Sequence, residues 1–561
     1  MSTSRTRRPA VIGLAVFSLA AALTTTATAS ERPDPRGTAH ADGIARTVAT
    51  VAATITDRST ASPVVTTPLG AVRGVRADGV DSFLGLRYAL APVGELRWKP
   101  PVPVTRWQGT LSATTYGNRC PASASGNGPE SLTEDCLFLN VQRPASAKPG
   151  ASLPVYVWIH GGGLENGSSN QHDGTQIVSQ TGAIVVTINY RLGLLGWLTH
   201  PALIAERGEG GNYGFLDQQA ALRWVQRNIR SFGGDPARVT IGGESAGAWS
   251  VCAHLSAPGS RGLFAQAVIE SGNCVSWALA DDLDTSAWIV PELGCTMSAD
   301  ASEAACLRSK TVAELLAAND ANDWGPGIVT GTPTLPQVTW DAVMSGSFAH
   351  VPVLVGANRD EGRGVGADVF AGATREQYEA TLIDWYGPDF AASLLSAYPW
   401  PATSDQWTAA YLFGAIVTDA GWMNGGCQGK QMNDALASFT PTYVYQFDHR
   451  TGPGLGPRDG YVWGATHAAE QPYMWPSFDN GTSIAATFDA AERRLARDLT
   501  AYWGSFIWTG RPDSAGGAHW PRLQPQRGAD AQLMSLRAGG RSTPITDGTL
   551  FAQHQCSVWG Y

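Results

Sequence analysis

The chain has 561 residues, of which 43% are hydrophobic and 16% are charged, a composition typical of ordinary soluble globular proteins. Its length alone favours two or more domains. The formal net charge is −9, and no cluster of lysines and arginines follows the first few residues. These values exclude a basic nucleic-acid-binding protein, so nucleic acid is not an expected partner.

The N-terminus has the pattern of a secretory signal peptide. Arg5, Arg7 and Arg8 precede an apolar run over residues 10–23, and the small residues A-T-A follow. A basic start, a short apolar segment and an A-x-A site predict a signal peptide over residues 1–29. We therefore expect a secreted, extracellular protein, exported by the Sec or the twin-arginine route. No later apolar run approaches the ~18 residues of a membrane-spanning helix, so stable membrane insertion is not expected.

The rest of the chain is predicted to alternate strands and helices. Residues 30–62 are rich in Thr, Ala, Asp and Arg without aromatic anchors, which is typical of a flexible leader. Strands are predicted over residues 154–160, 183–189, 238–243, 265–271, 351–357 and 442–447, and helices over 214–232, 246–255 and 488–507. This alternation predicts an α/β fold with a mainly parallel, twisted sheet and helices on both faces. The weakly periodic stretch from about 275 to 345 is expected to form cap-like insertions.

One serine lies between two glycines where a predicted strand meets a predicted helix. Gly243 and Gly247 flank Ser245 in a G-x-S-x-G motif, and these glycines permit a sharp turn. The Ser245 hydroxyl is then exposed at the tip of the turn, and the N–H of Ala246 opens the helix towards a substrate carbonyl. A purely structural turn is the alternative for the motif alone.

A serine nucleophile needs a base and an acid that orients the base. His449 and His467 both follow a predicted strand, and their spacing does not distinguish them. Asp360 and Glu361 follow another strand, at the carboxyl edge where ligands bind in such sheets. For this acidic pair a solvated turn is the alternative reading.

Three consecutive glycines follow a further buried strand. The motif H-G-G-G covers residues 160–163. Backbone N–H groups of glycines can approach a developing oxyanion closely because no side chain intervenes. A strand ending in these glycines, followed by a strand–G-x-S-x-G–helix unit, indicates acyl-transfer chemistry.

The eight cysteines all lie after the signal peptide, and an even number in an oxidising compartment indicates disulfides. Their spacing contains no C-x-x-C motif or Cys/His cluster, so no metal site is expected. Spacing alone does not select the pairing.

Taken together, the blocks PLGAVRG, SLTEDCLFLN, WIHGGG, VTIGGESAGA, GANRDEG and THAAEQPYMW resemble the type-B carboxylesterase/lipase family of α/β-hydrolases. The likeness covers about residues 64–559 and implies a catalytic domain over residues 63–561. It implies Ser245 as nucleophile, Glu361 as triad acid and His467 as general base. The block around His449 resembles a strand end of structural character instead.

The resemblance also implies supporting groups and disulfides. The implied oxyanion-hole donors are the N–H groups of Gly162, Gly163 and Ala246. The implied supporting residues are Ser271, Glu244 and Glu470. The implied bridges are Cys120–Cys136, Cys295–Cys306 and Cys427–Cys556, while Cys252 and Cys274 form either a fourth bridge or two buried thiols.

The implied activity is hydrolysis of a small carboxylic ester through an acyl-enzyme, without a metal or an organic cofactor. The loop between Cys120 and Cys136 lacks the aromatic residue with which cholinesterases bind a quaternary ammonium, so acetylcholine is not the expected substrate. A triacylglycerol lipase is the alternative, although no amphipathic lid is evident near that loop. A non-catalytic binding or adhesion protein of the same fold is a remote alternative, because all three triad positions are present.

Overall fold

The computed structural model describes residues 62–560, except residues 323, 480, 482 and 515. The predicted signal peptide, and the predicted leader apart from its last residue, therefore lie outside the described residues. Within the described part of the chain, no helix is both long and apolar enough to cross a membrane.

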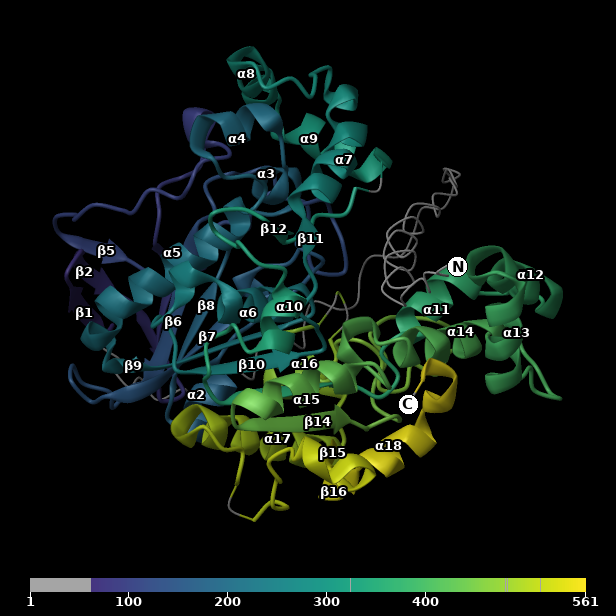
Figure 1. The fold of residues 1–561 in the computed structure, drawn as a ribbon. Helices are drawn as coiled ribbons and strands as arrows, with labels where there is room; N and C mark the ends of the chain where they lie inside the picture. Colours follow the sequence, from purple (N-terminus) through teal and green to yellow (C-terminus); the bar gives the residue numbers. More distant parts are fainter. Residues whose placement is uncertain (1–61, 323, 480, 482, 515, 561) are drawn as a thin grey trace, which may run out of the picture.

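An eleven-stranded sheet runs through the molecule (Figure 1). In spatial order its strands are β16 (Thr543–Thr546), β15 (Gln532–Leu536), β14 (Thr442–Phe447), β13 (Val353–Asn358), β10 (Gln266–Glu270), β9 (Gly234–Glu244), β7 (Leu153–Ile159), β8 (Ile184–Ile188), β6 (Phe138–Pro144), β4 (Val80–Arg87) and β3 (Val75–Ala77). All pairs from β15 to β8 are parallel, and the pairs at both ends are antiparallel. The predicted mainly parallel sheet is confirmed.

Both faces of the sheet are apolar, which explains why its strands read as continuous hydrophobic runs. In β7, Val157 and Ile159 pack into one core cluster, whereas Tyr156 and Trp158 pack into another. Successive side chains of a strand point to opposite faces, so these two clusters lie on opposite sides of the sheet.

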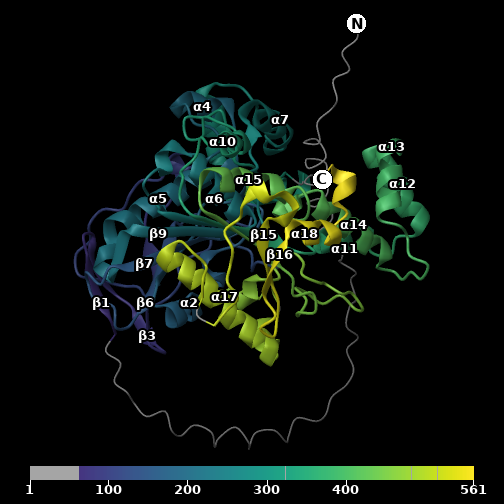
Figure 2. The same ribbon diagram turned by 60° about the horizontal axis from the view of Figure 1, so that its bottom comes forward.

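Helices cover both faces of the sheet, as predicted. The first cluster includes side chains of α5 (Tyr213–Asn228) and α6 (Ala246–Ser256). The second includes side chains of α2 (Thr175–Thr181) and α17 (Ala490–Thr509). Figure 1 and Figure 2 show α17 on one side of the sheet and α5 and α6 on the other.

Two groups of helices lie away from the sheet (Figures 1 and 2). One contains α7 (Leu279–Ile289), α8 (Ala301–Ser309) and α9 (Val312–Asn322), within the stretch expected to form cap-like insertions. The other contains α11 (Arg363–Phe370), α12 (Arg375–Tyr386), α13 (Pro388–Ala397) and α14 (Thr408–Asp419), and it has a hydrophobic cluster of its own. The second group was not distinguished in the sequence.

The remaining elements are short or connect these parts. They are β1 (Val64–Thr67), β2 (Gly70–Arg73), β5 (Thr110–Ser112), β11 (Trp277–Ala278), β12 (Val329–Thr330), α3 (Gly193–Trp197), α4 (Pro201–Arg207), α10 (Thr339–Ser345), α15 (Gly429–Phe439), α16 (Gln471–Met474) and α18 (Asp547–Gln553).

Local signals set the ends of the predicted helices. The helix expected over 214–232 is α-helical only to Asn228, and a 3₁₀ turn then ends at Gly233, whose φ of 94° favours glycine. The helix expected over 488–507 begins at Ala490, because Asp489 and Glu492 form a reciprocal capping box.

Four disulfides join all eight cysteines. Three bridges have the pairing that the resemblance implies, and Cys252–Cys274, left open above, is the fourth. The bridge between Cys427 and Cys556 closes the longest loop, with a sequence separation of 129.

Candidate active site

Ser245 lies in the tight turn between β9 and α6. Its backbone has φ 58° and ψ −125°, outside the regions that a non-glycine residue favours. A Cβ atom on Gly247 would lie 2.1 Å from Ile159 O, and one on Gly243 would lie 2.6 Å from Gly247 C. Both glycines are therefore required by the close approach of β7, β9 and α6.

His467 joins Ser245 to Glu361. Its Nε2 lies 2.9 Å from Ser245 Oγ, and its Nδ1 lies 2.7 Å from Glu361 Oε2. Glu361 is fully buried after β13, whereas the His467 side chain is 22% exposed and so remains accessible to a substrate. The geometry brings together a hydroxyl, an imidazole and a carboxylate from the ends of three segments that are far apart in sequence.

The other histidines that follow Ser245 have different partners. His449 Nε2 lies 3.1 Å from Glu492 Oε1, and His254 contacts Ser260 and Gln218. The structure therefore distinguishes His467 from His449, which spacing alone does not.

The glycine loop lies against the serine. A Cβ atom on Gly161 would lie 3.0 Å from Ser245 Cβ, so the backbone of this loop approaches the hydroxyl-bearing residue directly. Gly162 and Gly163 have φ of 101° and 66°, values that favour glycine. In the described part of the chain, the N–H groups of Gly162, Gly163 and Ala246 donate no backbone hydrogen bond.

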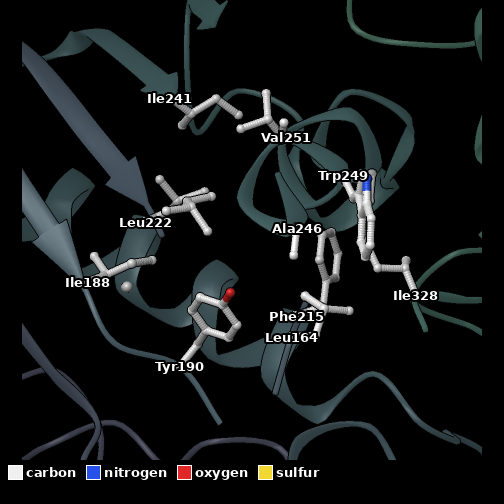
Figure 3. Close-up of a cluster of buried hydrophobic side chains, with 14 of the residues drawn as sticks. Leu164, Ile188, Tyr190, Phe215, Leu222, Ile241, Ala246, Trp249, Val251 and Ile328 are labelled. Atoms are coloured by element: carbon white, nitrogen blue, oxygen red, sulfur yellow. The ribbon is translucent and has the colours of Figure 1, made fainter. Parts of the chain in front are cut away.

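Apolar side chains surround the start of α6. Ala246 packs with Leu164, Phe215 and Trp249 in the close-up of Figure 3, and all are buried. Trp422 packs against the other side of the site, with its ring centroid 5.0 Å from that of His467. Nothing in the local sequence of Trp422 marks it as part of a site.

The charges around His467 determine its protonation. Burial alone lowers the pKa of His467, but the carboxyl groups of Glu244 and Glu361 more than offset this and raise it to about 9. Glu244 Oε1 lies 3.3 Å from His467 Nε2. Burial raises the pKa of Glu244 well above its ordinary value; His467 lowers it, and the charges of Glu470, Glu361 and Glu270 raise it further.

Glu470 and Ser271 also have an implied supporting role, and neither makes a hydrogen bond to Ser245, His467 or Glu361 among the described residues. Glu470 accepts a hydrogen bond from Asn358 Nδ2, and the N–H of Asn358 donates to Glu361 Oε1 at 2.7 Å. Ser271 is buried after β10, but its Oγ has no hydrogen-bond partner among the described residues, so it makes no hydrogen bond to Ser245, His467 or Glu361. Glu270, the residue before it, is a further buried carboxyl group that sequence analysis missed.

One group of described side chains is close enough to share a metal ion: Cys295, Glu303 and Cys306. The two cysteines are joined in a disulfide, and metals bind the thiolate form. No metal is therefore assigned to this group.

Comparison with known proteins identifies close relatives. The sequence matches the model of the carboxylesterase family over residues 61–559. Fumonisin B1 esterase of Sphingopyxis macrogoltabida is 37% identical over 479 residues, covering 82% of this chain and 84% of that protein. Cocaine esterase of Homo sapiens is 34% identical over 518 residues, covering 86% and 90%. A solved structure of a PNB esterase matches with a TM-score of 0.70 at 30% identity, covering 87% of this chain and 98% of that one, which confirms the expected α/β-hydrolase fold.

Proposed function

The chain belongs to the carboxylesterase family and is a carboxylic-ester hydrolase, and from that premise we propose that it acts through an acyl-enzyme on Ser245. The observation that carries the proposal is the position of His467, whose two ring nitrogens lie 2.9 Å from Ser245 Oγ and 2.7 Å from Glu361 Oε2. A base that is hydrogen-bonded to the nucleophile and oriented by an acid is the arrangement that activates a serine.

In the proposed reaction, Ser245 Oγ attacks the ester carbonyl while His467 Nε2 takes the hydroxyl proton. Glu361 accepts the hydrogen bond from Nδ1–H and stabilises the imidazolium that forms. His467 then gives the proton to the departing alcohol, which leaves the acyl group on Ser245. Water attacks this acyl group by the same general-base step and releases the carboxylic acid.

The negative oxygen of each tetrahedral intermediate would be held by the N–H groups of Gly162, Gly163 and Ala246. The free N–H groups, the left-handed glycine backbone and the contact of Gly161 with Ser245 support this assignment. One such donor contributes about 10²–10³ in rate in other serine hydrolases.

The proposed substrates are small esters in solution, and a lipase is the alternative. No helix lies between Cys120 and Cys136, so the described residues of this loop do not form an amphipathic lid. Asn127 Nδ2 also donates to Asn166 Oδ1 at 2.7 Å, which holds the loop against the glycine segment.

We also propose that residues 63–561 are the catalytic unit of a secreted protein, preceded by the signal peptide at 1–29 and the leader at 30–62. The four disulfides support an oxidising destination.

The test is pre-steady-state hydrolysis of p-nitrophenyl esters of increasing acyl length by the wild type and two serine variants. Ser245→Ala is expected to abolish the burst of p-nitrophenol and to lower kcat/KM by about 10⁴-fold or more. Ser250→Ala, on the same helix and bonded to Ala246 O at 3.1 Å, is the matched control and should keep the burst. A retained burst in Ser245→Ala would remove Ser245 from the mechanism, and activity rising sharply above the solubility limit would favour a lipase.

A further inference from the structure

A chain of buried hydrogen bonds leads from Glu361 into the core. The N–H of Asn358 donates to Glu361 Oε1 at 2.7 Å. The side-chain amide of Asn358 donates both to Glu470 Oε2 and to Thr466 O, the latter at 2.7 Å. Because Thr466 precedes His467, Asn358 links the two segments that carry the proposed triad acid and the proposed base.

The chain continues from Glu470 to Glu270. Gln471 Nε2 donates to Glu470 Oε1 and to Glu270 Oε2, each at 3.1 Å. The second oxygen of Glu270 accepts from Trp503 Nε1 at 2.7 Å. Glu270 ends β10 and Trp503 lies in α17, so these bonds connect the packing of α17 to the position of Glu361.

Negative charge is concentrated in this part of the core. Glu244, Glu270, Glu361 and Glu470 are 6%, 1%, 0% and 1% exposed. His467 is the one cationic side chain that pairs with any of them among the described residues, and no described lysine or arginine does. Unpaired buried charges are costly, so some of these carboxyl groups must hold protons.

Burial raises the pKa of several of these carboxyl groups, Glu244 among them. Burial and the neighbouring charge of Glu470 raise the pKa of Glu270 to about 8, and burial also raises that of Glu470. Tyr156 from β7 and Tyr445 from β14 also face Glu270, and neither brings a positive charge.

We propose that Glu270 is a positioning residue for ester hydrolysis: by accepting hydrogen bonds from Gln471 and Trp503 it holds Gln471 in place, and through Glu470 and Asn358 it fixes Glu361 against His467. The inference rests on the proposed function, in which Glu361 orients His467. Glu270 itself touches no reacting atom.

The test compares Glu270→Ala, which breaks the chain, with Glu270→Gln, which keeps the shape of the side chain and one of its two acceptor oxygens. In Glu270→Ala, kcat should fall at least about tenfold with KM within about threefold, because orientation is lost and binding is not. Glu270→Gln should lower kcat clearly less than Glu270→Ala does, because one of the two acceptor oxygens remains.

Two further variants keep the test decisive if Glu270→Ala does not fold. Trp503→Phe removes one donor to Glu270 and keeps an aromatic ring, and it should lower kcat by about three- to tenfold. Glu492→Gln alters a buried carboxyl group outside the chain of bonds and should leave kcat unchanged, even if it lowers Tm.

Full kcat in a folded Glu270→Ala or in Trp503→Phe would overturn the inference, and so would equal losses in Glu270→Ala and Glu270→Gln. If Ser245→Ala keeps its burst, the proposed function fails instead. If Ser245→Ala is inactive while Glu270→Ala is fully active, only the inference about Glu270 fails.

Discussion

Two histidines that follow strand β14 each contact a buried glutamate, and they differ in what lies beyond the histidine. His467 uses Nδ1 for Glu361 at 2.7 Å and Nε2 for Ser245 at 2.9 Å. His449 uses Nε2 for Glu492 at 3.1 Å, and its ring packs edge-on against Tyr473. Beyond His467 lies Ser245, whose backbone is strained, whereas beyond His449 lies an aromatic core.

The role of the carboxylate differs as well. Glu492 is the third residue of α17 and also caps its N-terminus, so the His449 pair fastens the end of β14 to that helix. Glu361 caps no helix, and both its oxygens accept N–H groups that fix its direction. A histidine beside an acid is therefore a candidate site only when its second nitrogen reaches a nucleophile.

The largest expected effect separates the two histidines. His467→Ala should lower kcat/KM by about 10⁴-fold or more, because no base remains to take the Ser245 proton. His449→Ala should lower Tm but keep kcat/KM within about tenfold, because a buried structural contact is lost. Steady-state hydrolysis of p-nitrophenyl acetate and thermal unfolding measure both. Loss of acyl-enzyme formation in His449→Ala alone would reverse the assignment.

The two glutamates should show the same contrast: replacing Glu361 should lower kcat far more than replacing Glu492, although by a smaller factor than for the histidines. Glu361→Gln should lower kcat by about 10³–10⁴-fold, because an amide does not stabilise the imidazolium. Glu492→Gln, the matched change in the other pair, should alter kcat little. The ratio of the two kcat values is the measurement, and a ratio near unity would contradict the triad.

The pH dependence of kcat/KM should follow the pKa of His467. His467 accepts a proton only when neutral, and its pKa is raised to about 9, so kcat/KM should fall as the pH falls below about 9. Glu244→Gln removes a carboxyl group 3.3 Å from Nε2 that in its ionised form raises the pKa of His467, so the pKa of His467 should fall. The midpoint of the acid limb should therefore move down by about one pH unit. Glu492→Gln should leave the midpoint in place, and an unchanged midpoint in Glu244→Gln would exclude this electrostatic role.

The smallest expected effect on activity comes from removing the Cys427–Cys556 bridge, which lies beside a third buried pair. His554 Nδ1 lies 2.5 Å from Asp419 Oδ1, close to the Cys427–Cys556 bridge. Replacing both of these cysteines with serine should lower the free energy of unfolding by about 2–4 kcal/mol, with kcat nearly unchanged.

The control for the bridge is the same double change at Cys295 and Cys306, whose sequence separation is 11. The entropy of the shorter loop should make its loss about 2 kcal/mol smaller. Denaturant unfolding measures both, and equal losses would argue against loop entropy as the cause.

Much of the fold and part of the site could be predicted from the local sequence. The turn at Ser245 could be predicted because small residues and a change from strand to helix periodicity mark it within a few positions. Glu270 and Trp422 could not be predicted, because their importance comes from Gln471, Trp503 and His467, which lie far away in sequence.

By itself, the sequence determined the alternation of strands and helices, the glycine-lined turn and the family resemblance, because periodicity and close backbone packing act over short distances. Spacing left His449 and His467 open and the resemblance implied His467; the tertiary structure places His467 at Ser245 and His449 at Glu492. It also decided that Cys252 pairs with Cys274 and that four glutamates share one buried region. These outcomes depend on which strand ends the sheet order brings together, and spacing along the chain does not specify that order.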